Sequence, residues 1–123
     1  MLYLSGQEPK GADGKPIKGR LGKDRTLEDG YEDARKVGLQ ILAAAKMALG
    51  SLAGIGSVVK LLGLVNAEAD FTDCPKVING CSDLLVEVLG EKGKHTRSAF
   101  GVNSLPAGTS CEIEAIIEIA EGY

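Results

Sequence analysis

The sequence predicts an α+β protein in which two helices cover one face of a single β-sheet. Two segments carry apolar or small side chains at three- and four-residue steps, which is the pattern of an amphipathic helix. Strand-like segments stand before, between and after them, so the expected order is strand, hairpin, helix, strand, helix, strand, strand. The chain has 123 residues, which fits one domain. The other face of the sheet must then meet water or another subunit.

The N-terminal part predicts a strand followed by a long connection. Leu2–Gln7, with the sequence LYLSGQ, is expected to form a short strand. Glu8–Leu21 is rich in proline, glycine and lysine, and we expect it to form a long hairpin or loop. The dipeptide Asp13-Gly14 inside this segment is a strong reverse-turn signal.

The first helix is predicted from a start signal, a periodic face and a stop signal. Thr26 stands three residues before Asp29, which is the spacing of a helix N-cap. The helix is expected to end at Gly50, because glycine favours the residue after a helix. The face between these signals comprises Tyr31, Ala34, Gly38, Ile41, Leu42, Ala45 and Leu49.

A buried strand and a second helix are predicted in the middle of the chain. The segment SLAGIGS is expected to be a loop, and the mostly apolar Val58–Val65 a central strand. Pro75 suits the first turn of the next helix, with Asp73 as its possible cap and Gly90 at its end. The periodic face of that helix comprises Val77, Ile78, Cys81, Leu84, Leu85 and Val88.

Two strands, His95–Asn103 and Ser110–Ile119, are expected to close the chain, joined by the segment SLPAG. Side chains of a strand point alternately to its two faces. In the last strand, one face carries Cys111, Ile113, Ala115, Ile117 and Ile119, and the other carries Glu112, Glu114, Ile116 and Glu118. The apolar set is expected under the helices. Each glutamate is explained by a solvated outer face, or alternatively one of them is a half-buried base.

Composition and the distribution of residues argue against several classes of function. The net charge is −3 and the pI is near 5.2, which argues against a general nucleic-acid surface, because such a surface is basic. The apolar runs end well short of the roughly 20 residues that a membrane span needs. No basic and then apolar leader stands at the start. Cys74, Cys81 and Cys111 form no close pair, so we expect reduced thiols in a cytoplasmic protein.

Few residues suggest chemistry by themselves. His95 is the only histidine and no cysteine pair is near it, so a metal site is not expected. Cys81 and Cys111 fall on apolar faces, where an inert core thiol is the simpler interpretation. Ser5 lacks the G-x-S-x-G surroundings of a catalytic serine. Arg97, within a predicted strand, is either an edge residue in a salt bridge or a bidentate ligand for a carboxylate.

Three segments together resemble the RidA/YjgF family. They are LYLSGQEP near the start, PKVINGCSDLL in the second helix and RSAFGVNSLPAGTSCEIEAIIEI at the end, so that the resemblance spans Tyr3 to Ile119. The resemblance is greatest to a less studied branch of that family. It implies a chorismate-mutase-like fold with one mixed sheet, and a homotrimer with clefts between subunits. It also implies hydrolysis of reactive 2-imino or enamine acids to 2-oxo acids and ammonia, with no metal or organic cofactor.

The resemblance also assigns site residues by position. Arg97 matches the arginine that binds the substrate carboxylate, and Glu112 matches the residue that positions or activates the attacking water. Four further positions match residues that line the cleft: Ser5, Gly6, Asn79 and Ala99. Many relatives have a cysteine where this chain has Ala99, so a thiol-dependent role at that position is excluded.

Family members usually have one more strand before the segment LYLSGQ, with a tyrosine that borders the site. We therefore expect residues 1–123 to form a single domain that lacks this N-terminal strand.

Two alternatives to imine hydrolysis stay open. The same cleft could bind a small 2-imino or 2-oxo acid without turnover, as a sensor or regulatory protein. Cleavage of RNA is the third possibility, because similar proteins carry an endoribonuclease label. Two observations argue against RNA cleavage. The charge balance is acidic, and an aromatic content of 4% offers few side chains on which the bases of a single strand could stack.

Overall fold

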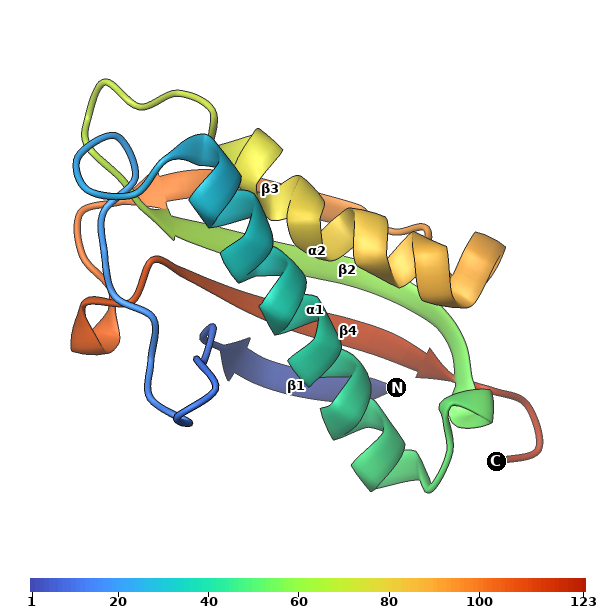
Figure 1. Cartoon of the computed structure of the whole chain (residues 1–123). Helices are drawn as coiled ribbons and strands as arrows, with labels where there is room; N and C mark the ends of the chain where they lie inside the picture. The colour runs from blue at the N-terminus through green and yellow to red at the C-terminus, as the bar shows by residue number, and fades with distance from the viewer.

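The computed structural model describes residues 1–123 and confirms the α+β class, with two long helices on one face of a four-stranded sheet (Figure 1). The strands are β1 (Leu2–Gln7), β2 (Ile55–Asn66), β3 (Thr96–Val102) and β4 (Cys111–Ile119). Their order across the sheet is β1-β4-β2-β3. Only β2 and β3 are parallel, so the sheet is mixed, and β1 and β3 are its edges.

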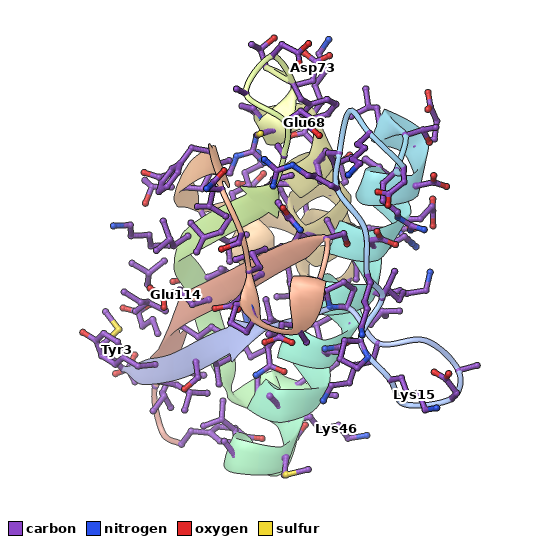
Figure 2. All side chains as sticks on the ribbon, turned by 90° about the vertical axis from the view of Figure 1, so that its left-hand side faces the viewer. Tyr3, Lys15, Lys46, Glu68, Asp73 and Glu114 are labelled. Carbon is purple, nitrogen blue, oxygen red and sulfur yellow. The ribbon has the colours of Figure 1, made fainter.

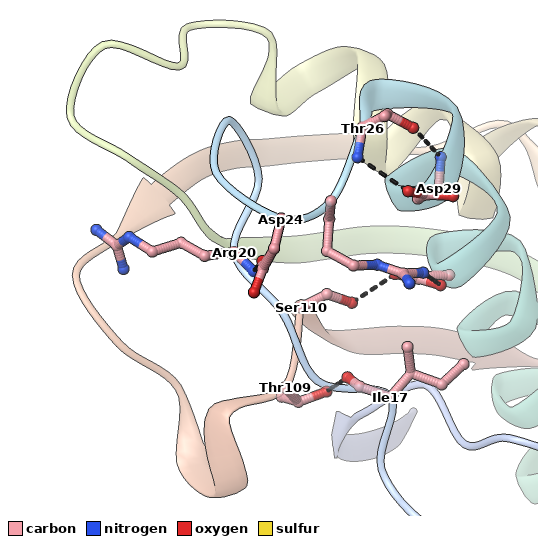
Figure 3. A network of polar contacts seen from close by, with 9 residues as sticks. Ile17, Arg20, Asp24, Thr26, Asp29, Thr109 and Ser110 are labelled. Atoms are coloured by element: carbon pink, nitrogen blue, oxygen red, sulfur yellow. Dashed lines mark hydrogen bonds and ion pairs between the residues drawn. The ribbon is translucent and has the colours of Figure 1, made fainter.

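Helix α1 (Leu27–Leu49) begins and ends where the sequence predicts. The Thr26 hydroxyl accepts a hydrogen bond from the Asp29 N–H at 3.1 Å, and the Asp29 carboxylate accepts one from the Thr26 N–H at 3.0 Å. This reciprocal capping box satisfies two N–H groups that the first turn would leave unpaired (Figure 3). At the other end Gly50 adopts a left-handed conformation with φ 83°, as expected of a C-terminal glycine.

Helix α2 (Cys74–Leu89) has Pro75 in its first turn and Gly90 at its end, as predicted. Asp73 occupies the N-cap position, as predicted, although its side chain makes no capping hydrogen bond. The carboxylate of Asp73 instead lies 3.6 Å from the Lys76 ammonium, on the surface. The two helices approach closely at Gly80, where a β-carbon would collide with the backbone carbonyl of Tyr31 on α1.

The strands differ from the prediction at their ends. Strand β2 begins at Ile55 and not at Val58, after a short 3₁₀ turn, Leu52–Gly54. The glycine-rich sequence suggested a loop, but Gly56 lies in the strand where the backbone of β4 passes closely. A β-carbon at Gly56 would lie 3.1 Å from the Glu118 carbonyl oxygen. Strand β3 is one residue shorter at each end than expected, and β4 starts one residue later.

The long connection between β1 and α1 forms a loop with isolated bridges and no hairpin ladder. One bridge joins Lys10 to Pro16, across the turn in which the Asp13 carboxylate accepts from the Lys15 N–H at 3.0 Å. Farther along, the Thr109 hydroxyl donates to the Ile17 carbonyl at 3.0 Å (Figure 3). The loop is therefore fixed to the segment that leads into β4.

One buried carboxylate joins this loop to α1 and to the start of β4. Asp33 on α1 is 1% exposed, and its carboxylate accepts from the Arg25 guanidinium at 2.6 and 3.2 Å. It also accepts from the Ser110 hydroxyl at 2.7 Å (Figure 3). All its partners are donors, so the buried charge is both paired and hydrogen-bonded.

The two faces of β4 are divided as predicted. Its buried residues under the helices are Cys111, Ile113, Ala115 and Ile117. Ile119, at the end of the strand, is only half-buried. Figure 2 shows Glu114, together with Tyr3 of β1, on the side of the sheet that the helices leave open. Neither α1 nor α2 combines the length and apolar character that crossing a bilayer requires.

Candidate functional site

The guanidinium of Arg97 is anchored on the helix-covered side of the sheet. Arg97 lies on the edge strand β3, in register with Leu61 of β2, a residue that is completely buried under the helices. One terminal nitrogen donates to the Ser82 hydroxyl on α2 at 3.0 Å, and the other donates to the Pro75 carbonyl at 3.2 Å. A guanidinium has five N–H donors, so three remain for an incoming anion.

A hollow of about 400 Å³ opens beside this guanidinium. Its lining residues are Asn79, Ser82, Val86, Lys94, His95 and Arg97. The hollow therefore joins two of the predicted site residues, the asparagine of α2 and the arginine of β3. Ala99 lies two residues beyond Arg97, on the same face of the strand, and packs against the core.

The other predicted residues form a second group, where β1 meets β4. Glu112 is half-buried, and its carboxylate covers the backbone of Gly6 so closely that a β-carbon at Gly6 would collide with it. A side chain at Gly6 would therefore require the Glu112 carboxylate to move. Ser5 is exposed next to it and lines a hollow of about 360 Å³ between the two strands, which Glu114 also lines.

The environment of Glu112 makes its carboxyl a weaker acid than an ordinary glutamate. Burial raises the pKa of this carboxyl above its usual value, and the negative charges of Glu8 and Glu114 raise the pKa further. Glu8 stands just after β1, beyond a register shift in the pairing of β1 with β4. A proton acceptor with a pKa nearer to neutrality is better matched to general base catalysis.

Sequence reasoning missed Glu8 as a neighbour of Glu112. Its position after a predicted strand was visible, but the pairing of β1 with β4 joins the two ends of the chain and leaves no local signal.

The two groups do not meet within one chain. Arg97 is in register with Leu61, and Glu112 is in register with Leu64, three residues farther along the same strand, β2. An odd separation along a strand puts side chains on opposite faces. Burial agrees, because Leu61 is completely buried while Leu64 is half-buried. One chain therefore carries Arg97, Asn79 and Ala99 on one side, and its remaining predicted site residues on the other.

Two more polar residues join the Arg97 group, and sequence reasoning gave them no role there. The ring nitrogens of His95 lie 2.6 Å from the Gly93 carbonyl oxygen and 2.9 Å from the Ser82 hydroxyl. His95 is two residues before Arg97, so the period of a strand could have placed it on the same face. Ser82 is three residues after Asn79, so the period of a helix could have placed it on the same face.

Neither a metal centre nor a reactive thiol accompanies these groups. The structure places no three His, Cys, Asp or Glu side chains close enough together to bind a metal ion. Burial raises the pKa of the Cys81 thiol to about 12, and it also raises the pKa of Cys111. Both thiols therefore stay protonated at neutral pH.

The family model described as "YjgF/chorismate_mutase-like, putative endoribonuclease" matches residues 1–119. The chain belongs to this family. It is 41% identical to Protein TCP17 of Trypanosoma cruzi over 119 residues, which are 96% of this chain and 74% of that protein. The family resemblance inferred from the three sequence segments is thus confirmed.

Solved structures of the YjgF-like family agree with the fold. A protein of unknown function from Agrobacterium tumefaciens is 42% identical, with a TM-score of 0.93 over 96% of this chain and 77% of that one. A putative endoribonuclease from Shewanella oneidensis is 34% identical, with a TM-score of 0.90 over 94% and 77% of the two chains. RidA from an Antarctic Psychrobacter is 27% identical, with a TM-score of 0.62 over 94% and 77%. The fold therefore matches the first two more closely than it matches this RidA.

Proposed function

We propose that this protein hydrolyses small 2-imino acids to 2-oxo acids and ammonia, at sites shared between copies of the chain. One observation carries the proposal: a half-buried guanidinium that donates to two protein oxygens also lines a hollow, and it has N–H groups left to donate. Planar guanidinium donors match the two oxygens of a carboxylate, and such bidentate pairs are charge-assisted. Arg97 would hold the acid group of the substrate, while Asn79 at the same hollow offers its amide for a further hydrogen bond.

Glu112 would act on the attacking water. As the water oxygen bonds to the imine carbon, the carboxylate takes one of its protons and the C=N electrons move to nitrogen. That proton then passes to the nitrogen, which gives an adduct with one hydroxyl and one amino group on the same carbon. Glu112 next takes the hydroxyl proton and gives it to the amino nitrogen, so that the C–N bond breaks, ammonia leaves and the C=O bond of the 2-oxo acid forms. General base help of this kind is typically worth about 10²–10⁴-fold, which is sufficient for a bond that is already labile in water.

The opposite placement of Arg97 and Glu112 favours a ring of copies as the active form. Two different surfaces of the chain must meet for the residues to converge, and a contact between unlike surfaces closes into a ring when its rotation permits. This agrees with the homotrimer that the family resemblance implies. The open sheet face is suited to such a contact, because it exposes large apolar side chains at Tyr3 and Phe100.

The test is the rate of ammonia release from freshly generated 2-iminobutanoate. We expect the wild-type protein to accelerate it and Arg97→Ala to lose the acceleration while its oligomeric state is unchanged. The matched control is Arg35→Ala, which removes a half-buried arginine paired with Glu87 between the two helices. An unaltered rate with folded, oligomeric wild-type protein contradicts the proposal, and so does full activity of Arg97→Ala.

A second candidate is binding of a small 2-oxo acid without turnover. It is favoured by the fact that Arg97 and Asn79 share a hollow on one side of the chain, away from Glu112. Calorimetric titration with 2-oxobutanoate, run beside the ammonia assay, separates the two candidates. Binding that Arg97→Ala abolishes, together with no turnover, would favour the second.

A further inference from the structure

A continuous chain of hydrogen bonds ends at Arg97. The Gly93 carbonyl oxygen lies 2.6 Å from Nδ1 of His95, and Nε2 of the same ring lies 2.9 Å from the Ser82 hydroxyl oxygen. That hydroxyl oxygen lies 3.0 Å from a terminal nitrogen of Arg97. The chain thus joins a backbone carbonyl to the guanidinium through two side chains.

The direction of each hydrogen bond follows from the chemistry of its atoms. A carbonyl has no proton to give, so Nδ1 of His95 must carry one. In a neutral imidazole the other nitrogen, Nε2, is then an acceptor. The Ser82 hydroxyl therefore donates to Nε2, and its oxygen is left to accept from Arg97. Every bond points the same way, from the guanidinium toward the Gly93 carbonyl.

The far end of this chain is rigid. Gly93 ends a 3₁₀ turn, Gly90–Gly93, and is buried against α2, where a β-carbon would collide with the carbonyl of Leu85. Ser82 lies in the middle of α2, and His95 directly precedes β3. Three elements therefore converge on the guanidinium.

We propose that Ser82 and His95 are positioning residues, which hold the guanidinium of Arg97 in the orientation that receives a carboxylate. Arginine has a long, flexible side chain, so fixing it before the ligand arrives spares the entropy of ordering it on binding. The Pro75 carbonyl fixes the other terminal nitrogen. The inference rests on the proposed function only in that Arg97 receives the acid group of the ligand.

The pair is not arranged as a nucleophile and its base. A serine that attacks substrate needs electron density on its oxygen, and here that oxygen accepts a hydrogen bond from a cation. The contact draws density away from the Ser82 oxygen and stabilises the guanidinium orientation. Ser82 therefore acts through Arg97.

Nitrogen-15 NMR of the ligand-free protein tests the positioning directly. We expect slow rotation about the Nε–Cζ bond of Arg97, with separate signals for its terminal nitrogens, and the Nδ1–H tautomer of His95. In Ser82→Ala the terminal signals of Arg97 should average. Averaged signals in the wild-type protein, or an Nε2–H tautomer at neutral pH, would overturn the proposal whether or not the protein proves to be a deaminase.

A second test measures ligand affinity and imine kinetics in variants of Ser82 and His95. Loss of one hydrogen bond to a charged group should weaken 2-oxobutanoate binding about tenfold in Ser82→Ala and in His95→Leu. His95→Gln should restore binding, because its amide oxygen can accept from the Ser82 hydroxyl. In the imine assay KM should rise with kcat nearly unchanged, since carboxylate anchoring is common to ground state and transition state.

The matched control is Ser98→Ala, which removes an exposed hydroxyl from the other face of the same strand and should leave binding unchanged. If the wild-type protein neither binds 2-oxobutanoate nor hydrolyses the imine, the proposed function is wrong. The NMR measurement still tests whether Ser82 and His95 orient Arg97. Equal ligand affinity in wild type, Ser82→Ala and His95→Leu refutes the positioning role and leaves the proposed function standing.

Discussion

Arg97 and Glu112 lie on opposite faces of one sheet, in register with positions three residues apart on the strand between them. Neither residue can reach the other around a sheet whose core is filled by buried side chains. If both act on one small substrate, they must come from different copies of the chain. Whether the proposed reaction can occur therefore depends on how copies of the chain assemble.

Mixing two inactive variants tests the shared site. Arg97→Ala spoils one half of each site and Glu112→Gln spoils the other, so a site between unlike copies can combine the two intact halves. Random assembly of equal amounts puts both variants in about three quarters of closed rings of three, with one intact site in each, so about one quarter of wild-type activity is expected. The measurement is ammonia release after joint refolding.

The control for this mixture is the double variant Arg97→Ala/Glu112→Gln, refolded with Arg97→Ala. No pairing of these two chains supplies an intact arginine, so no activity should return. Failure of the first mixture to regain activity, despite proven exchange of subunits, would place both residues in one chain's site or remove one of them from the mechanism.

Local signals in the sequence were sufficient to predict much of the secondary structure. The capping box of Thr26 and Asp29 and the terminal glycine at Gly50 act within a few residues of each other, so they can be recognised without tertiary information. The alternation in β4 was equally visible. The start of β2 was missed because Gly56 suggested a loop, whereas the glycine serves a close approach to the backbone of β4.

Long-range pairing is what the sequence could not supply. The family resemblance pointed to Arg97 and Glu112, but their opposite placement depends on both strands pairing with β2, which lies between them. The contacts of Ser82 with His95 and Arg97 likewise join α2 to the approach to β3, across 13 and 15 residues. Such contacts follow from the order of strands and the packing of helices.

The raised pKa of Glu112 predicts how its replacement changes stability with pH. The folded state holds this proton more tightly than the unfolded chain, so the contribution of Glu112 to stability falls as pH rises from the ordinary glutamate pKa through the raised one. Glu112→Gln, which mimics the protonated form, should therefore raise the free energy of unfolding at pH 7. The gain should disappear below about pH 4.

Urea unfolding at both pH values, at one protein concentration, measures this effect. Glu118→Gln on the same strand is the control, because Glu118 is exposed near the far end of β4 and should show little change. A variant Glu112→Gln that is less stable than wild type at pH 7 would mean that the carboxylate is held by a favourable partner.

Removing the buried carboxylate of Asp33 should destabilise the fold strongly. Asp33→Ala leaves the Arg25 guanidinium and the buried Ser110 hydroxyl without their acceptor. Breaking a buried ion pair in this way costs about 3–5 kcal/mol, and the lower end applies because the Arg25 side chain is 25% exposed. Asp33→Asn keeps an oxygen for Ser110 and should lose less. Equal free energies of unfolding of Asp33→Ala and wild type in urea would show that these contacts do not stabilise the fold.

The contact between the helices should not tolerate a methyl group at Gly80. In Gly80→Ala the new β-carbon meets the Tyr31 carbonyl, a backbone atom that cannot move without shifting α1. Overpacking of this kind costs about 1–3 kcal/mol, although alanine favours a helix more than glycine does. Thermal unfolding should show a lower midpoint than wild type. Val88→Ala, at an exposed position of the same helix, should change the midpoint much less.

The three thiols should be inert in the folded protein. Cys74, Cys81 and Cys111 are buried, and burial raises the pKa of each, to about 12 for Cys81. A thiol is nucleophilic only when deprotonated, so at pH 8 almost no reactive thiolate is present. Ellman's reagent should therefore find no fast-reacting thiol in native protein and all three in guanidinium chloride. Rapid labelling of the native protein would contradict this prediction, because it would require a conformation that opens the core.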